Sequence, residues 1–317
     1  LRWLFPRRIF LHRSSLFDAR WLVVRGVAHA LLSWPLTITV VGTMLWVTGH
    51  LRGAIGMPSW ESPKDRAGVI AAFTLATFLA DDLTRFLLHW GMHRVPALWE
   101  LHKVHHSADV LTPITLYRVH PVESVLNRLR GVLTLGLVTG LFAWAVPGQL
   151  KGWEILGVDA IGFVWAALGS NLRHSHVWLT WTRPLEHVFV SPAQHQIHHG
   201  RGRESWDKNF GSTLAIWDWL FGTLAIAHGA RPPRVGLARG ERNHRLTAWS
   251  ALVDPLIAAA RALARSVTGR GKREGAAAAR RARVAPRRIV QGFRADRARK
   301  IHAAPAGKAN GRTPSRG

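Results

Sequence analysis

The sequence predicts an all-α fold: an integral membrane bundle of about four transmembrane helices with a histidine-rich helical cap on the cytoplasmic side. Three observations support this. Several segments are nearly free of charge, the connecting segments alternate between rich and poor in Lys and Arg, and histidines recur at helical spacing. About 20 apolar residues, rising 1.5 Å each, cross the hydrocarbon core of a bilayer. The 317-residue chain has no Cys, which excludes disulfides, thiolate metal sites and cysteine nucleophiles.

Four segments are expected to span the membrane. Residues 27–48 contain no Lys, Arg, Asp or Glu and predict one helix, kinked at Pro35. Residues 67–93 start apolar and continue at helical spacing with one polar face, which predicts a second helix. The remaining two predicted spans are residues 126–147 and the shorter residues 155–169.

The basic residues predict the orientation of these spans. Lys and Arg are frequent before the first span, between the second and third, and after the fourth, whereas the other two connections contain few. Because cytoplasmic loops carry the excess of Lys and Arg, both termini and the histidines are expected in the cytoplasm. A multi-pass protein of a bacterial inner membrane fits this distribution.

Charge also divides the chain, which has a formal net charge of +25, into three regions. Residues 1–25 are a basic N-terminal segment, residues 26–230 the membrane-embedded domain, and residues 231–317 a basic, low-complexity tail. From Arg261 onward there are 17 Lys and Arg against two acidic residues, so we expect this tail to be disordered. Its charge would attract an anionic lipid surface, and no folded motif indicates a specific nucleic-acid partner.

Twelve of the 18 His lie between positions 89 and 199, in spaced sets. One set reads His-x-x-x-His, and two others read His-x-x-His-His. Helix positions i, i+3 and i+4 share a face, so each set can direct two or three imidazoles at one point. The three sets supply eight candidate metal ligands, and His174 or His176 could bring the number to nine or ten; the eight are His89, His93, His102, His105, His106, His195, His198 and His199.

Neutral imidazole binds Fe, Zn, Cu and Ni, so these sets predict a metal site. One tetrahedral zinc uses four ligands, and this larger number suits two metals. Other metal architectures do not fit. The Glu-x-x-His spacing of carboxylate-bridged di-iron bundles occurs only at Glu241–His244, outside the sets, and no His-Glu-x-x-His motif is present.

Four residues are candidates to support the ligands. Asp82 precedes His89 by seven residues and shares its face, so it either accepts an imidazole N–H or is a solvated helix-end carboxylate. Asn171 and Asn209 are candidate hydrogen-bond partners of ligands, and His120 is either such a partner or a simple loop residue. The segment 206–226 predicts an amphipathic interfacial helix or a lid over the cytoplasmic opening.

The His-x-x-x-His set and the two His-x-x-His-His sets, placed among short hydrophobic helices, resemble the fatty acid hydroxylase/sterol desaturase superfamily. The stretches 170–176, 191–199, 209–211 and 217–223 agree, and the resemblance covers about residues 8–226. It implies an integral membrane enzyme whose histidines hold two Fe on the cytoplasmic side. His174 matches a further histidine region of the family, with His176 as its rival or partner.

The resemblance also implies an activity: O2 and reducing equivalents are used to hydroxylate or desaturate a membrane lipid such as a sterol or fatty acyl chain. We favour hydroxylation, with no catalytic residue beyond the metal ligands. A separate electron donor is expected, either cytochrome b5-like, a ferredoxin or a reductase, because no fused His-Pro-Gly-Gly segment is present. The alternatives are the same cage holding zinc for non-redox chemistry, or a non-catalytic metal-binding membrane protein. Zinc is also a possible substitute in purified protein.

Overall fold

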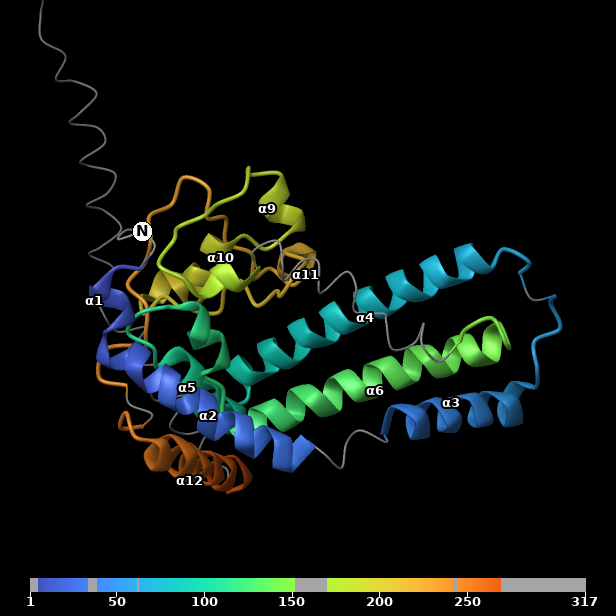
Figure 1. The fold of residues 1–317 in the computed structure, drawn as a ribbon, viewed down its shortest axis with the longest axis horizontal. Helices are drawn as coiled ribbons and strands as arrows, with labels where there is room; N and C mark the ends of the chain where they lie inside the picture. Colours follow the sequence, from blue (N-terminus) through green and yellow to red (C-terminus); the bar gives the residue numbers. More distant parts are fainter. Residues whose placement is uncertain (1–4, 34–38, 62, 152–169, 242–243, 269–317) are drawn as a thin grey trace, which may run out of the picture. The chain divides into compact units, whose positions relative to one another are not determined.

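The computed structural model describes residues 5–33, 39–61, 63–151, 170–241 and 244–268. Within these ranges the fold is all-α, with ten α-helices, three short 3-10 helices and two isolated β-bridges in place of any sheet (Figure 1). The α-helices are α1 Arg7–Phe10, α2 Arg13–Ser33, α3 Thr39–Ile55, α4 Arg66–Arg94, α5 Pro96–His106, α6 Pro121–Ala145, α9 Leu185–Val188, α10 Pro192–His198, α11 Ile216–Leu220 and α12 Ala248–Val267. The 3-10 helices are Pro113–Tyr117, Ser170–His174 and Arg203–Ser205.

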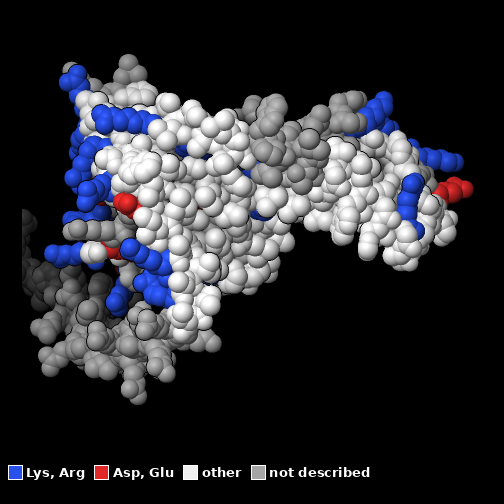
Figure 2. All heavy atoms as spheres, turned by 90° about the horizontal axis from the view of Figure 1, so that it is seen from below, with Lys and Arg blue, Asp and Glu red and all other residues white. Residues whose placement is uncertain are grey.

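The three helices α3, α4 and α6 lie side by side, with α6 in contact with both of the others (Figure 1). Of the described helices, α4 and α6 are long and apolar enough to cross a membrane. Only 22% and 28% of their most apolar windows are buried, so most of this apolar surface faces outward, unlike that of a soluble core helix. Figure 2 shows that, on the face seen from below, Lys and Arg gather mainly toward the two ends, with a broad surface of mostly uncharged residues between them.

Local sequence sets where the long helices begin and end. The side chain of Asp65 caps α4 by accepting the Gly68 N–H at 3.1 Å. That helix ends before Pro96, because the residue preceding a proline is pushed out of the helical region. His120 caps α6 by accepting the Val122 N–H, and Pro121 occupies the first position, where a missing N–H costs nothing.

The expected spans meet different outcomes. The segment 67–93 forms α4 and most of 126–147 lies in α6, and both helices are long and apolar enough to cross a membrane. The segment 27–48 is not one described helix: its ends belong to α2 and α3, and residues 34–38 between them lie outside the described residues. Pro35, which has no N–H for a helical hydrogen bond, falls in this interval. The segment 155–169 lies outside the described residues.

The short helices α5, α9, α10 and α11 gather at one end of α4 and α6, beside α2 (Figure 1). There Phe17 and Trp21 of α2 form a small core with Ala251 of α12. The tail expected to be disordered from residue 231 therefore contains a helix that packs on the body. The expectation failed for α12 because the Arg-rich, low-complexity sequence begins after this helix, whereas the apolar residues of α12 itself recur at helical spacing.

The contact between α3 and α6 depends on two glycines of α6. A Cβ at Gly136 would lie 2.5 Å from the Thr43 Cβ, and one at Gly140 would lie 2.7 Å from the Val47 Cβ. The two glycines are four residues apart and let the helix backbones approach closely, as small residues do between membrane helices. The Thr48 hydroxyl uses this approach to donate to the Gly140 carbonyl at 3.0 Å.

We therefore expect Gly136→Ala to lower the free energy of unfolding by about 1–3 kcal/mol, the usual range for overpacking a well-packed contact. Thermal unfolding in detergent micelles measures it. Gly131→Ala is the matched control, because a Cβ at Gly131 on the same helix meets nothing within 4 Å. Equal unfolding temperatures for the two variants would contradict the close approach of α3 and α6.

Candidate metal centre

Nine histidines come together in two groups, each with its ligand atoms within 4.8 Å of one another. We call them the five-histidine group and the four-histidine group. The five-histidine group contains His89, His93, His102, His106 and His198, and the four-histidine group contains His105, His174, His195 and His199. His176, the tenth candidate, belongs to neither group; its ring packs edge-on against Phe10 with centroids 6.2 Å apart.

Helix α5 supplies both groups because of how helical positions diverge. His102 and His106 are four residues apart and point to the five-histidine group, whereas His105 points to the four-histidine group. The start of α5 is fixed by Pro96 at its first position, directly after Val95 ends α4. The last six residues of α5 are all buried. This sharp α4–α5 junction brings the α5 histidines beside those at the end of α4.

Helix α10 divides its histidines in the same way. His198 joins the five-histidine group, while His195 and His199 join the four-histidine group. A capping box sets its start: the Ser191 hydroxyl accepts the Gln194 N–H at 3.1 Å, and the Gln194 side chain accepts the Ser191 N–H at 2.8 Å. The capping box thus satisfies two of the backbone donors at the start of this seven-residue helix.

Three members of the five-histidine group are fixed through Nδ1. The Nδ1 atoms of His89 and His198 lie 2.8 Å from the carbonyl oxygens of Phe210 and Lys208, and that of His102 lies 2.8 Å from Glu123 Oε1. A carbonyl only accepts, so Nδ1 carries the proton in His89 and His198, and the Nε2 lone pair is free. In the described part of the chain, the Nε2 atoms of all five are buried without a hydrogen-bond partner.

The four-histidine group has its Nε2 atoms in a chain of short separations. Those of His105 and His174 lie 3.1 Å apart, those of His174 and His195 3.0 Å, and those of His195 and His199 3.2 Å. Imidazoles that share one metal at about 2.1 Å place their nitrogens about 3.0–3.4 Å apart. Both groups therefore fit a metal ion: one by its orphaned nitrogens, the other by its spacing.

Burial keeps these imidazoles neutral. Removal from water lowers the pKa of His198 to about 3, despite the opposing hydrogen bond from Nδ1 to the Lys208 carbonyl. Burial also lowers the pKa of His105 and of His199 well below the usual value, with further lowering by neighbouring histidines. Neutral imidazole is the form that donates a lone pair to a metal, so the site is prepared for binding at pH 7.

The carbonyls that hold His89 and His198 belong to a loop, not to the amphipathic helix expected over 206–226. Only α11 is helical there. Asn209 adopts a positive φ of 55° and ties the loop to α10, donating to the Gln194 carbonyl at 2.9 Å. The Asp218 carboxylate accepts the N–H groups of Phe210 and Gly211 at 2.8 and 2.7 Å. These local side-chain bonds compete with helix formation and fix both carbonyls.

Asp82 follows neither alternative that the sequence left open: among the described contacts it accepts no imidazole N–H, and it is not a solvated helix-end carboxylate. Its carboxylate is buried and instead accepts the backbone N–H groups of Thr213 and Leu214 at 3.0 Å, and the Trp217 indole N–H at 2.9 Å. It thus anchors the loop that carries the Phe210 carbonyl, so its support of His89 is indirect. Sequence spacing identified the correct helix face and missed the distant partner.

Asp82→Asn should therefore destabilise the loop, because an amide offers one acceptor oxygen where three donors converge. Losing bonds to a charged acceptor costs about 1.5–3 kcal/mol each. We expect faster proteolytic cleavage within residues 206–223, read by mass spectrometry of the fragments. Asp81→Asn is the control, since Asp81 pairs with Arg85 and Arg130 and makes no hydrogen bond to the loop. Equal cleavage rates in both variants would refute the anchoring role.

The other supporting residues also have different partners from those expected. His120 caps α6, and its Nε2 lies 3.0 Å from the Leu252 carbonyl, so it contacts no histidine of either group through these bonds. Asn209 donates to the Gln194 carbonyl, so it supports the site by fixing the loop to α10. The Asn171 side chain lies outside the described residues. Glu123 was not among the predicted supporting residues, although it lies within the His-Pro-Val-Glu stretch. A carboxylate three residues after a helix cap was the available signal.

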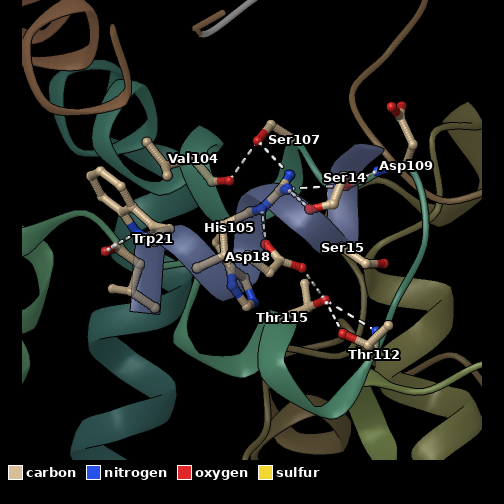
Figure 3. A network of polar contacts seen from close by, with 12 residues as sticks. Ser14, Ser15, Asp18, Trp21, Val104, His105, Ser107, Asp109, Thr112 and Thr115 are labelled. Atoms are coloured by element: carbon tan, nitrogen blue, oxygen red, sulfur yellow. Dashed lines mark hydrogen bonds and ion pairs between the residues drawn. The ribbon is translucent and has the colours of Figure 1, made fainter. Parts of the chain in front are cut away.

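Behind α5 lies a buried polar network that holds α2 in place (Figure 3). Arg118 pairs with Asp18, both side chains being fully buried, and also donates to the Ser107 hydroxyl at 3.2 Å. Its third bond is to the Ser14 carbonyl at 2.8 Å, and Thr115 donates to Asp18 at 2.8 Å. Because Ser107 directly follows His106, the network fixes the end of α5 that carries two ligand candidates.

The comparisons with known proteins match the part of the chain that carries the grouped histidines. Residues 74–223 match the family model described as fatty acid hydroxylase, and all nine grouped histidines lie in this range. The chain is 30% identical to the human (Homo sapiens) alkylglycerol monooxygenase over 149 residues, which are 47% of this chain and 30% of that protein. It is also 30% identical to the ornithine lipid hydroxylase OlsE of Rhizobium tropici, over 47% of this chain and 39% of that protein.

The very-long-chain aldehyde decarbonylase GL1-8 of Oryza sativa subsp. indica is 25% identical over 65% of this chain and 69% of that protein. The alkylglycerol monooxygenases are matched over about a third of their length or less. No solved structure matches the chain.

Proposed function

The chain belongs to the fatty acid hydroxylase family through residues 74–223, and from this premise we propose that it is an O2-dependent di-iron hydroxylase of a membrane lipid. The observation that carries the proposal is the pair of buried histidine groups, with five orphaned Nε2 atoms in one and closely spaced Nε2 atoms in the other. In this proposal the nine grouped histidines are the iron ligands and His176 is not.

The chemistry of the donor set is compatible with iron, and the family match is the reason to propose iron over the other metals that imidazole binds. Nine imidazoles and no carboxylate in the two groups make a neutral, nitrogen-rich site. Bound iron would supply O2 activation and C–H oxidation, which no side chain performs. The protein's own task is then to hold the imidazoles in one tautomer, exclude water and position a carbon of the lipid. The Nδ1 contacts to Phe210, Lys208 and Glu123 serve the first of these tasks.

The lipid and the location follow from the same reasoning. The names of the relatives include an alkylglycerol and an ornithine lipid as molecules acted upon, so we propose an acyl or alkyl lipid with a polar headgroup as substrate. We propose a multi-pass location with the histidines on the cytoplasmic side. A separate electron donor would supply the reducing equivalents.

Metal analysis of the full chain, purified in detergent from iron-sufficient cells, tests the proposal. We expect about two iron per chain and lipid-dependent O2 uptake, with both lost in a His105→Ala/His198→Ala double variant that removes one ligand from each group. Zinc alone in a preparation that turns over lipid would overturn the proposal, because zinc has no redox chemistry.

A further inference from the structure

Helix α12 exposes a row of large apolar side chains. Trp249 is 74% exposed, Leu256 41% and Leu263 59%. They are spaced seven residues apart, which places them on one face of the helix. The opposite side packs on the body through small residues, with Ala251 and Ala262 buried. The helix thus turns its larger apolar residues outward and its smaller ones inward, the reverse of a helix selected only to fill a core.

The attachment of α12 places this face at the end of a candidate membrane span. The Leu252 carbonyl pairs with the Nε2 of His120, the residue that caps α6. Ala251 packs against Phe17 and Trp21, and the Trp21 indole donates to the Val119 carbonyl at 3.2 Å, next to His120. In Figure 1, α12 is foreshortened whereas α6 runs across the view, so α12 is inclined to the span and does not prolong it.

The composition of α12 matches the boundary between lipid and water. Tryptophan concentrates at this boundary, and Arg261, exposed on a different face of the helix, can reach lipid phosphates. Lys and Arg also gather at this end of the long helices (Figure 2). A second copy of the chain is a poorer occupant of the apolar face, because each copy carries a net charge of +25.

We propose that α12 is a membrane-surface helix whose face formed by Trp249, Leu256 and Leu263 inserts into an anionic bilayer beside the start of α6. Through Leu252 and His120, the helix attaches the histidine-bearing end of the molecule to that surface. The proposal does not depend on which metal the histidines bind, or on whether they bind one.

Because the chain has no Cys, a single introduced Cys can be labelled alone. The full chain carrying Leu256→Cys or Leu263→Cys receives a nitroxide label and is reconstituted in vesicles of phosphatidylethanolamine and phosphatidylglycerol. Electron paramagnetic resonance then compares collision of the label with O2, which concentrates in lipid, and with a water-soluble nickel chelate. Arg261→Cys, also exposed on α12, is the matched control. All three positions are exposed, and the unfolding temperature of each variant confirms that it is folded.

We expect at least a threefold higher ratio of O2 to nickel collisions at positions 256 and 263 than at position 261. A ratio equal to that at position 261 would show a face in water and overturn the proposal. Low collision with both reagents would show a face covered by protein, which also overturns it. In phosphatidylcholine alone the contrast should shrink; an unchanged contrast would refute the anionic preference.

Discussion

Replacing His174 by alanine is expected to remove about half of the bound metal and to reduce lipid turnover by more than about 100-fold, a loss beyond the 10–100-fold typical of a supporting residue. His174 links the members of the four-histidine group, because its Nε2 atom lies within 3.1 Å of the Nε2 atoms of both His105 and His195. Its removal leaves three imidazoles there, while the five-histidine group stays intact. Metal content per chain and O2 uptake with lipid measure the two effects.

His176→Ala is the matched control for this experiment. The two histidines are two residues apart in the same stretch of sequence, but His176 lies outside both groups and packs against Phe10. We expect it to retain both metals and nearly full turnover. Equal metal loss in the two variants would show that the grouping of Nε2 atoms does not define the ligands. Loss of all metal in His174→Ala would show that the two groups bind metal as a single unit.

The sequence predicted helices α4 and α6 well because their signals are local. The apolar window of each helix lies within one stretch of chain, and the expected and described bounds of α4 differ by one residue at each end. Histidine spacing likewise selected eight of the nine grouped residues, whereas His174 came from the resemblance, with His176 as its rival or partner. The division of α5 between two groups was not predictable, because a spacing of three or four residues does not show which neighbouring segment each ring faces.

The expectation of one amphipathic helix over 206–226 was wrong for a related reason. The apolar residues of this segment have helical spacing, but other residues within it interrupt a helix. Asn209 and Gly222 both adopt positive φ, at 55° and 71°, and Gly211 lies where a Cβ would be 2.6 Å from the Leu214 carbonyl oxygen. These signals were present in the sequence. The contact of Asp82 with Thr213 was not, since it joins positions 131 residues apart.

Glu123→Ala is expected to weaken metal binding to the five-histidine group by about 10–100-fold, the usual effect of removing the partner of a ligand imidazole. The Oε1 of Glu123 lies 2.8 Å from His102 Nδ1, and both side chains are buried. This contact keeps the proton on Nδ1, so Nε2 retains its lone pair and the ring keeps its orientation. Without it, the ring can rotate or take the other tautomer, in which Nε2 carries the proton. Titration with a competing chelator measures the affinity.

Glu123→Gln separates orientation from charge. Its amide oxygen can still accept from His102 Nδ1, so a defect smaller than in the alanine variant would assign most of the effect to holding the ring. A defect as large as that of alanine would assign it to the negative charge, which raises the basicity of the imidazole. Glu100→Gln controls for the loss of an acidic residue of α5, because Glu100 pairs with Lys103 at 2.7 Å. The metal affinity of this variant should be unchanged. If both glutamate substitutions at position 123 left the affinity unchanged, His102 would be held by its packing against the other rings.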